Sequence, residues 1–551
     1  MNRLSKKTFN CFVLICGLLL SGCQSTGKNA EQKDSATKQE INIVFDSEMG
    51  TADISQATDF YSFITLNNAY EGLYRLDGKN QPVLAEAKEK ANVSEDGLTY
   101  TIKIREDAKW SNGDSVTADD YVYSWQRTVD PDTAAGYANM FDPVKNAKDI
   151  REGKTDKEKL GVEAVNDHEL KITLEKPTVY FEALLAFPTY FPQNEKIVEK
   201  YGDKYALTSK NAVYNGPFLL TDFSGAGTDN AWGLKKNDKY WDAKSVKLTT
   251  INFNVVKDST TSLNLFESGE ADDVTLSGEI ARQKKNDKNF VSQTGGTTQY
   301  LEINQKAEDS PFRNKNFRKA ISMAIDRKKM VESVIGDGSE VANGVVPAKI
   351  GTNPDTGKDF VDDVNSTLSY DKDQAQEYWN KAKEELGVDK LSIDLLASDT
   401  DQSKKTCEFL QGSLEQNLPD LEVNVTNVPL SIRLDRSDNG KFDMVMNNWL
   451  GEYPDPTNFL KLFTSDSSYN RGHWVNEEYD QYVDDALNKN ANDPAARWQD
   501  MIAAEKIMDE ELGVIPLYQV AGAHLHSQRF KGQVYHSVGA GYDYKYAYVE
   551  E

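Results

Sequence analysis

Segments that favour strands alternate with segments that favour helices along almost the whole chain, and this alternation constrains the fold more than any other feature. Residues 98–104, with the sequence LTYTIKI, place four apolar side chains on one face, as in a half-buried strand. A turn at residues 112–114 follows it. Thr117, with Asp120 three residues later, then predicts the start of a helix whose inner face carries Tyr121, Val122, Trp125 and Val129. The pattern predicts an α/β or mixed protein.

Two further helices are predicted from apolar side chains that recur every three or four residues. One stripe, with the spacing that packs a helix against a sheet, consists of Phe317, Ala320, Ile321, Ala324 and Ile325. The other helix is predicted to begin at Asp493-Pro494 and to stop at Gly513, before a strand-like run at residues 514–518. Its apolar side chains include Trp498, Met501, Ile502 and Met508.

The body beyond residue 40 is too long for one ordinary domain, since about 150 residues per domain gives about three domains. The whole chain has 63 Lys and Arg against 88 Asp and Glu, a balance that makes nucleic acid an unexpected partner. Of the 4 cysteines, Cys407 alone lies beyond residue 23, so no disulfide is expected within the body and Cys407 is expected to be a buried thiol. We therefore expect a large core to supply the stability.

The first 23 residues have the pattern of a lipoprotein signal. Three basic residues precede a short apolar run at residues 11–20, which is far below the roughly 20 residues that a membrane-spanning helix needs. Small residues then lead into Cys23, so residues 1–22 are predicted to be removed and Cys23 to carry a diacylglycerol anchor. Residues 23–40 are polar and predict a flexible tether. We expect the protein at the extracytoplasmic face of the cell membrane.

Nine strings in the body resemble, in the same order, those of the extracellular peptide-binding proteins of ABC importers. They are residues 96–105 (DGLTYTIKIR), 108–114 (AKWSNGD), 116–120 (VTADD), 122–127 (VYSWQR), 214–218 (YNGPF), 240–242 (YWD), 268–270 (SGE), 318–326 (RKAISMAID) and 449–460. Together with Cys23, this ordered set resembles an oligopeptide-binding lipoprotein of family 5 of the extracellular solute-binding proteins.

The resemblance implies a two-lobed periplasmic-binding-protein-like (Venus-flytrap) α/β fold with an additional domain. Lobe I is expected to combine residues 41–70, 196–297 and 520–551, the extra domain II to span residues 71–195, and lobe III to span residues 298–519. The lobes are expected to close around a ligand by rigid-body motion. The expected ligands are oligopeptides, the expected partners are the permease and ATPase subunits of an ABC transporter, and a monomer is expected.

A receptor for many peptide sequences has to hold what peptides share, namely main-chain groups and charged termini, and strand addition does this. Residues 447–456 resemble the family's cleft loop, in which many relatives carry, at the position of Glu452, an aspartate that binds the peptide's α-amino group. The glutamate keeps the charge but changes its reach by one methylene. The alternative for Glu452 is a plain surface carboxylate. Asp455 is a rival, although an N-cap before Pro456 is a sufficient structural explanation for it.

The resemblance implies further cleft residues. Asn448, Trp449, Leu450 and Gly451 are expected to offer main chain to the ligand. Trp449 is also expected to line a ligand pocket, and the alternative is a place in the hydrophobic core. Tyr137 matches a tyrosine that closes over the ligand, with an ordinary half-buried aromatic as the alternative, and Thr58, Asp59 and Phe60 match a strand that pairs with the ligand. Arg436 is a candidate for a peptide carboxylate.

An enzyme is the competing class of function. The chain contains no His-Glu-x-x-His run, no Gly-x-Ser-x-Gly elbow and no phosphate-binding loop with lysine, and we expect no catalysis and no cofactor. His524 and His526 share one face of a predicted strand, but two histidines without a third ligand predict a structural role rather than a metal site. Within binding proteins, the alternative ligands are a signalling peptide such as a pheromone, a dipeptide, nickel, haem or glutathione.

Overall fold

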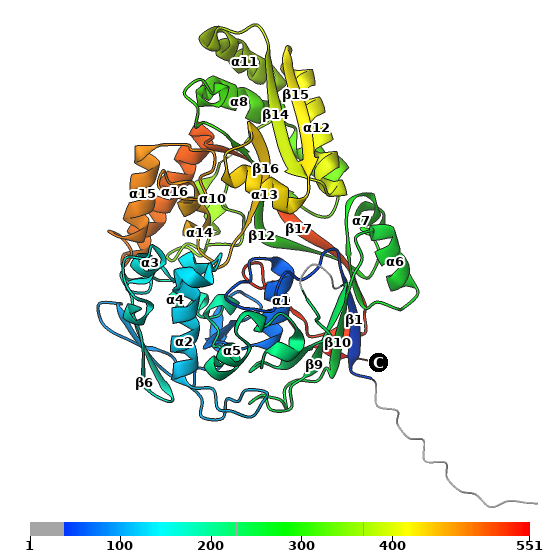
Figure 1. Cartoon of the computed structure of the whole chain (residues 1–551). Helices are drawn as coiled ribbons and strands as arrows, with labels where there is room; N and C mark the ends of the chain where they lie inside the picture. Colours follow the sequence, from blue (N-terminus) through cyan, green and yellow to red (C-terminus); the bar gives the residue numbers. More distant parts are fainter. Residues whose placement is uncertain (1–37, 226–229, 367, 551) are drawn as a thin grey trace, which may run out of the picture. The chain divides into compact units, whose positions relative to one another are not determined.

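The computed structural model describes residues 38–225, 230–366 and 368–550, and Gln39–Glu551 form one compact unit (Figure 1). The predicted signal peptide, Cys23 and the predicted tether up to residue 37 lie outside the described residues. None of the helices in the described part of the chain combines the length and the apolar character that crossing a bilayer requires.

An 11-stranded mixed sheet organises this unit. The strands lie in the order β15, β14, β16, β12, β17, β11, β1, β10, β9 and β8, and β13 pairs with β17 outside this path. The bounds are β1 (Glu40–Phe45), β8 (Phe218–Thr221), β9 (Ala231–Lys236), β10 (Thr250–Val255), β11 (Asp273–Leu276), β12 (Phe290–Ile303), β13 (Glu340–Val341), β14 (Leu391–Ser398), β15 (Leu421–Val428), β16 (Met444–Leu450) and β17 (Val514–His526).

The two longest strands, β12 and β17, connect the two halves of this sheet. Residues 290–294 of β12 pair with residues 521–525 of β17, next to β11, whereas residues 298–302 pair with residues 514–519, next to β16. The pairing between these two stretches is interrupted by register shifts around Gly295 and Gly296. The strands therefore pass from one half of the sheet to the other through an irregular segment.

A separate sheet forms from residues that follow the first strand and helix. Its order is β4 (Asn92–Val93), β5 (Thr99–Lys103), β7 (Glu169–Thr173) and β6 (Val162–Asn166). The predicted strand at residues 98–104 is confirmed as β5, with Tyr100 and Ile102 buried. The predicted helix is confirmed as α2 (Ala118–Val129), and the Asp120 carboxylate accepts a hydrogen bond from the Thr117 backbone N–H at 2.9 Å.

The two other predicted helices are also confirmed. Helix α8 (Lys315–Ala324) buries its whole predicted stripe. Helix α16 (Pro494–Glu511) begins after the N-cap Asp493 and ends at Leu512, which adopts a left-handed conformation before β17. The Asp493 carboxylate accepts the Ala496 N–H at 3.0 Å, which satisfies one of the otherwise unpaired donors of the first turn.

The remaining elements complete the two halves. The helices are α1 (Phe60–Ala69), α3 (Ala147–Arg151), α4 (Phe181–Leu184), α5 (Glu195–Tyr201), α6 (Ser259–Glu267), α7 (Gly278–Lys284), α9 (Arg327–Met330), α10 (Phe360–Val364), α11 (Lys372–Leu386), α12 (Asp401–Asn417), α13 (Leu430–Asp438), α14 (Thr457–Leu460) and α15 (Glu477–Leu487). The short strands are β2 (Tyr74–Leu76), β3 (Pro82–Leu84), β18 (Phe530–Lys531), β19 (Val534–Tyr535), β20 (Tyr542–Asp543) and β21 (Tyr548–Val549).

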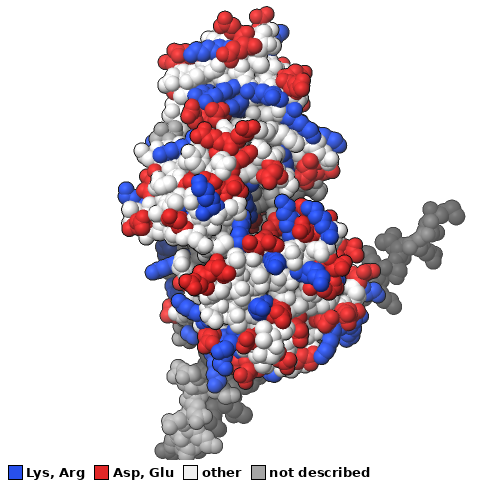
Figure 2. All heavy atoms as spheres, turned by 90° about the vertical axis from the view of Figure 1, so that its left-hand side faces the viewer, with Lys and Arg blue, Asp and Glu red and all other residues white. Residues whose placement is uncertain are grey.

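Cys407 lies in the core beneath the sheet half that contains β14 and β15. It is fully buried on α12, which packs against both strands (Figure 1). Burial raises the pKa of its thiol to about 12, so the thiolate is not populated near neutral pH. The predicted buried thiol is confirmed. On the outside, acidic and basic side chains are interspersed over the face shown in Figure 2.

Candidate ligand-binding site

The second half of β16 has an unpaired edge. On one side, β16 pairs with β12 along its whole length, from Met444 opposite Ile303 to Leu450 opposite Thr297. On the other side, its neighbour β14 pairs only with Met444 and Val445. Among the described residues, no strand pairs with residues 447–450 on that side. Unpaired N–H and C=O groups on a strand edge are a template for an added strand.

Glu452 lies two residues beyond this edge and is buried, with 6% of its surface exposed. Its Oε2 accepts a hydrogen bond from Asn458 Nδ2 at 2.6 Å. Among the described residues, no Lys, Arg or His nitrogen lies within 4.0 Å of its carboxylate. Burial raises the pKa of Glu452 above its ordinary value, although Lys461, Asn458 and Tyr137 act in the opposite direction. The alternative of a plain surface carboxylate is therefore wrong, and Glu452 is a buried carboxyl group with no ion-pair partner within 4.0 Å among the described residues.

Asn458 connects Glu452 with the strand edge. Its Oδ1 accepts the Trp449 Nε1–H at 2.9 Å, while its Nδ2 donates to Glu452. Trp449 is half-buried, and its ring meets that of Tyr469 edge-on at 4.9 Å. Asn458 lies within residues 449–460, which resemble the family, but the sequence predicted no role for it. Asn458 lies six residues after Glu452 on the one-turn helix α14. Only the tertiary structure shows that its side chain contacts Glu452.

Asp455 differs from Glu452 although the two residues are three positions apart. Its carboxylate accepts hydrogen bonds from Arg497 Nη1 at 2.8 Å and Nη2 at 2.7 Å, and from the Thr457 N–H at 3.0 Å. Asp455 thus contacts the first residue of α14, although the N-cap is Pro456 rather than the expected Asp455, and Arg497 adds a cation partner that the sequence did not indicate. This charge is satisfied within the chain, so Asp455 is not a free site for a ligand cation.

Tyr137, which the resemblance predicts as a site residue, lies next to Glu452. Burial and the neighbouring Glu452 carboxylate raise the pKa of its hydroxyl well above the ordinary value. Its ring packs edge-on against Phe63 at 5.5 Å and lies 6.1 Å from Phe187. These contacts fix the ring and direct the hydroxyl towards the carboxylate, so the fold brings Tyr137 and Glu452 together across more than 300 residues of sequence.

The expected strand at Thr58, Asp59 and Phe60 is wrong. Asp59 is the N-cap of α1, and its carboxylate accepts hydrogen bonds from the Ser62 N–H at 2.8 Å and the Ser62 hydroxyl at 2.6 Å. Phe60 is the first residue of that helix. The local capping interaction decides the conformation here. Thr58 still lies beside the Tyr137 loop, because a Cβ atom added to Gly136 would come within 2.7 Å of its methyl group.

A small cavity touches Glu452. Its volume is about 10 Å³, counted as the space that the centre of a water molecule can occupy, so it holds about one water molecule. Its lining comes from four separate stretches of chain: Asn67 and Leu76, then Ala183, Ala186 and Phe187, then Glu452, and then His536, Gly539 and Ala540. Glu452 is therefore enclosed by parts of the chain that are far apart in sequence.

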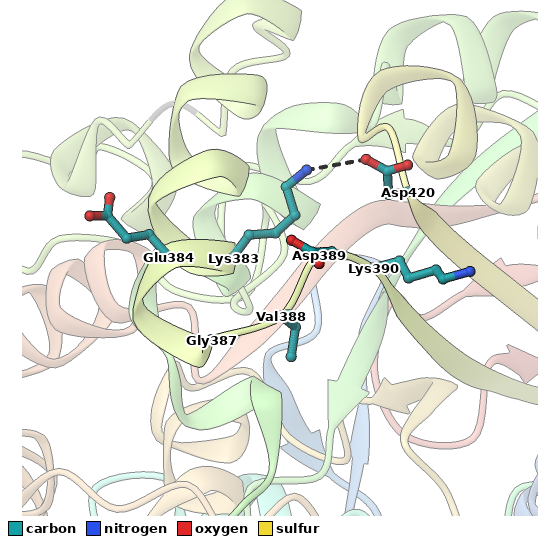
Figure 3. Close-up of a pocket in the computed structure, with 7 residues that line it drawn as sticks. All are labelled: Lys383, Glu384, Gly387, Val388, Asp389, Lys390 and Asp420. Atoms are coloured by element: carbon teal, nitrogen blue, oxygen red, sulfur yellow. Dashed lines mark hydrogen bonds and ion pairs between the residues drawn. The ribbon is translucent and has the colours of Figure 1, made fainter.

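A larger hollow than this cavity lies elsewhere, on the surface at the end of α11 (Figure 3). Its volume is about 590 Å³, and its lining consists of Lys383, Glu384, Gly387, Val388, Asp389, Lys390 and Asp420. Lys383 and Asp420 form an ion pair at 3.3 Å across it. The hollow contains none of the predicted site residues and no buried polar group that lacks a partner. We therefore place the candidate site at β16 and Glu452.

The paired histidines have structural partners. His524 Nδ1 and His526 Nδ1 lie 2.8 Å and 2.7 Å from the two oxygens of Asp273. The opposite ring nitrogens lie 2.9 Å from the Tyr542 hydroxyl and 2.8 Å from the Phe530 carbonyl oxygen. All four ring nitrogens therefore have protein partners, as the predicted structural role requires.

Comparison with known proteins agrees with this geometry. The model of the bacterial extracellular solute-binding proteins, family 5 (middle region), matches residues 79–471. A dipeptide-binding protein of Lactococcus lactis subsp. cremoris is 36% identical over 549 residues, covering 98% of both chains. The oligopeptide-binding protein OppA of Bacillus subtilis is 32% identical, covering 96% of this chain and 97% of the relative.

Solved structures agree as well. Listeria monocytogenes OppA bound to peptide has a TM-score of 0.84 and 41% identity, covering 94% of this chain and all of that one. The pheromone receptor PrgZ has a TM-score of 0.85 and 40% identity, covering 93% of this chain and 100% of that one. The predicted two-lobed α/β fold with an extra domain is confirmed, and the family consists of binding proteins rather than enzymes. The chain belongs to family 5 of the bacterial extracellular solute-binding proteins.

Proposed function

We propose that this protein captures extended oligopeptides between two lobes on the extracytoplasmic face of the cell membrane and delivers them to the permease of an ABC importer. The observation that carries the proposal is the unpaired edge of β16 beside the buried Glu452, which has no cation within 4.0 Å among the described residues. An added ligand strand satisfies the edge, and a ligand ammonium neutralises the carboxylate.

Main-chain pairing also explains how one site accepts many sequences. Asn448, Trp449, Leu450 and Gly451 offer groups that every residue of a peptide can match. Tyr137 then lies over the ligand's first residue, where its hydroxyl approaches the carboxylate that holds the ammonium. Thr58 lies beside the Tyr137 loop, whereas Asp59 supports the site by holding the start of α1.

We propose that lobe I comprises residues 41–70, 196–297 and 520–551, domain II residues 71–195, and lobe III residues 298–519. The passage of β12 and β17 between two halves of the sheet and the separate β4–β7 sheet support these boundaries. Contacts between the proposed lobes surround the site. The Gly539 N–H donates to the Gly451 carbonyl at 2.9 Å, and the Gly451 N–H donates to the Gly296 carbonyl at 2.8 Å.

Domain II also meets the proposed lobe III beside the site. The rings of Tyr180 and Tyr453 stack at a centroid distance of 4.2 Å and an angle of 9°. We expect such contacts to be lost when the parts separate, so that they contribute to the free energy of closure around a ligand. The proposal predicts that saturating peptide decreases the radius of gyration in small-angle scattering.

The proposed anchor is a diacylglycerol on Cys23, and the proposed active form is a monomer. The basic start, the short apolar run and the small residues before Cys23 support the anchor. Replacing Cys23 by alanine is expected to move the protein from the membrane fraction to the soluble fraction, and retention in the membrane fraction would contradict the anchor.

The decisive test of the function compares peptides with free and acetylated amino termini, using the full chain in detergent and calorimetry. Acetylation removes the ammonium, so it is expected to weaken binding by more than tenfold. Equal affinities would remove the proposed role of Glu452. Native mass spectrometry of the purified chain identifies what co-purifies, and peptides of mixed sequence are the expected result.

A single signalling peptide is the second candidate ligand, and the likeness to the pheromone receptor PrgZ over 93% of this chain is the observation that favours it. Recovery of one defined peptide instead of a mixture would support it. A chain that binds neither peptide mixtures nor a defined peptide would contradict both candidates and favour haem, glutathione or a hydrolytic activity.

A further inference from the structure

Two carboxyl groups on one face of α16 are enclosed without satisfying their oxygens. Glu505 and Asp509 are four residues apart on this helix, so their side chains are neighbours. Glu505 has 1% of its surface exposed, yet its Oε2 has no hydrogen-bond partner among the described residues. The same holds for both carboxylate oxygens of Asp509, and all three oxygens are sealed from solvent. Charges in such a place are costly unless something neutralises them.

The two carboxyl groups meet at Gly344. A Cβ atom on this residue would stand 1.9 Å from Glu505 Oε1 and 3.4 Å from Asp509 Oδ1, so both groups border the same point in space. Two negative charges this close repel each other in an enclosed site. Burial raises the pKa of both carboxyl groups, and the Asp509 charge raises that of Glu505 further. The pair therefore favours the state in which it holds a proton.

One buried cation faces the pair from α9. Arg327 is 2% exposed, and burial lowers its pKa only to about 10, so it stays charged near neutral pH. Its guanidinium donates to the Pro516 carbonyl at 2.7 Å and to the Ser322 carbonyl and hydroxyl, both at 2.9 Å. These acceptors are neutral, and the Ser366 hydroxyl and Arg327 act to lower the pKa of Asp509. One guanidinium balances one carboxylate, so a single proton on the pair makes the group of three neutral.

The neighbouring helices supply no second cation. Helices α10, α14 and α15 pack against α16, and none of them contains Lys, Arg or His within its bounds. Tyr479 on α15 stays neutral, because burial and the neighbouring carboxylates raise the pKa of its hydroxyl, which donates to the Leu460 carbonyl at 2.6 Å. On α10, Asp362 is exposed and Asp363 accepts the Trp498 Nε1–H at 3.0 Å.

The pair anchors a segment that leads to the irregular passage between the two halves of the sheet. Glu505 Oε1 accepts the N–H groups of residues 345–346 at 2.6 and 3.2 Å. The Ala348 N–H donates to Gln519 Oε1 at 3.1 Å, and Gln519 Nε2 donates to the Gly295 carbonyl at 2.9 Å. Hydrogen bonds therefore connect α16 with the part of β12 in which the pairing with β17 shifts.

We propose that Glu505 and Asp509 form a proton-binding site that makes the anchoring of residues 343–348, and with it the affinity for ligand, dependent on pH. While the pair holds one proton, Glu505 Oε1 keeps both N–H groups and the segment stays fixed. When that proton is lost, the second charge has no counter-charge, and movement of one carboxylate towards solvent releases the segment.

The release reaches the candidate site through the next residue of β12. Gly296 accepts the Gly451 N–H at 2.8 Å, and Gly451 precedes Glu452. Loosening this contact disfavours the arrangement in which Glu452 is enclosed, so affinity falls as the pH rises. The effect on affinity rests on the proposed function, whereas the proton site itself does not.

Urea denaturation of the full chain in detergent, from about pH 5 to about pH 8, tests the proton site. The folded wild type binds one proton more than its unfolded form, so its unfolding equilibrium constant relative to that of D509N is expected to rise with pH, by up to about tenfold per pH unit. E510Q is the control, because it removes an exposed carboxylate of the same helix that pairs with Lys315 at 3.2 Å. It is expected to keep the wild-type pH dependence. A ratio between wild type and D509N that is constant with pH would overturn the proposal.

Calorimetry with an oligoalanine peptide tests the coupling to the ligand. The affinity of wild type relative to that of D509N is expected to fall about threefold to tenfold over the same pH range. The ratio cancels the titration of the peptide's amino group and of Glu452, which both proteins share. A constant ratio would contradict the coupling. Failure of the peptide to bind at every pH would contradict the proposed function, while denaturation still decides on the proton site.

Two further measurements guard against misfolding and against a metal. E505Q tests the same site if D509N fails to fold, and in wild type the hydrogen-exchange protection of the N–H groups of residues 345–346, corrected for intrinsic rates, is expected to fall as the pH rises. Constant protection would contradict the proposal. Carboxylate oxygens also suit Ca²⁺, so stabilisation of wild type by Ca²⁺ that D509N abolishes would assign the site to a metal and overturn it.

Discussion

Among the buried carboxylates of the described residues, those in two regions are held in opposite ways. In the first region, Arg75 donates to Glu71 Oε1 at 3.2 Å and to Asp543 Oδ2 at 2.7 Å. Glu71 also accepts hydrogen bonds from Tyr240 and Trp241, both at 2.5 Å. Both carboxylates therefore have a cation partner and hydrogen-bond donors supplied by the chain itself.

In the second region, Glu452 is buried with only neutral donors and no ion-pair partner among the described residues. The comparison teaches that burial alone does not identify a binding site. The carboxylates around Arg75 are paired within the fold and contribute to structure, whereas Glu452 lacks an ion-pair partner and also lies beside an unpaired strand edge, which makes it the candidate for pairing with a ligand cation. The two regions should therefore respond differently to the same kind of substitution.

The largest expected effect is on stability in the first region. Substituting Arg75 by methionine leaves Glu71 and Asp543 buried without their cation, and we expect a loss of about 3–5 kcal/mol in the free energy of unfolding. Urea denaturation measures this loss. A change below about 1 kcal/mol would mean that the network is not a structural unit, and the contrast with Glu452 would then not hold.

The next effect is on binding in the second region. E452Q removes the charge but keeps the shape, and we expect affinity for peptides with a free amino terminus to fall about 10- to 100-fold. The stability of the ligand-free chain should stay constant or rise slightly, because an uncompensated buried charge is gone. Calorimetry and urea denaturation check the two quantities.

D455N is the matched control for E452Q. It removes a carboxylate three residues away that pairs with Arg497, so it should lower stability and leave the difference between free and acetylated peptides unchanged. If D455N lowered this difference as much as E452Q does, Glu452 would not be the specific contact for the ammonium.

The pH dependence of stability should have opposite signs in the two regions. Burial raises the pKa of Glu452, so the folded chain keeps this proton where the unfolded chain has lost it. Its contribution to stability therefore falls as the pH rises from the ordinary glutamate pKa through the raised value. Burial also acts to raise the pKa of Asp543, but Arg75 and His536 outweigh it and lower the pKa. That contribution is present above the ordinary aspartate pKa and is lost as the pH falls through the lowered one.

Urea denaturation across this pH range, on wild type and E452Q, isolates the Glu452 contribution as the difference between the two curves. We expect wild type to lose stability relative to E452Q as the pH rises, by no more than about 1.4 kcal/mol per pH unit. A difference that is constant with pH would indicate that Glu452 has an ordinary pKa and is not an unsatisfied buried charge.

The smallest effect concerns Tyr137. Y137F removes the hydroxyl beside Glu452 and keeps the ring packed against Phe63 and Phe187, so the fold should be retained. We expect peptide affinity to fall by about 0.5–1.5 kcal/mol, or roughly two- to tenfold. Unchanged affinity with unchanged melting temperature would assign Tyr137 to packing alone, which was the alternative from the sequence.

Much of the fold was predictable because its signals are local. The stripe on α8, the alternation in β5 and the Asp493 cap of α16 each depend on residues within one element, and all three predictions are confirmed. The strand expected at Thr58–Phe60 failed for a related reason. The capping of α1 by Asp59 is also a local signal, and it prevailed over the likeness to a strand in the family.

The sequence predicted several residues of the candidate site but not the contacts between their side chains. The motif around Trp449 and Glu452 was sufficient to select the loop, and Tyr137 was found by the same comparison. The roles of Asn458 and Arg497 were not predicted, since each depends on a contact between side chains that local periodicity does not record. Asp455 and Glu452 look alike in sequence, and only their partners separate them.

By itself, the sequence determined the alternation of strands and helices, the buried stripes, the lone buried thiol and the family, because these follow from residue type and spacing along the chain. The tertiary structure alone decided which carboxylate is satisfied and which is not. The free energy of a buried charge depends on the few groups within about 4 Å of it. In this fold some of those groups come from segments far away in the sequence, as Tyr137 does for Glu452 and Arg497 for Asp455.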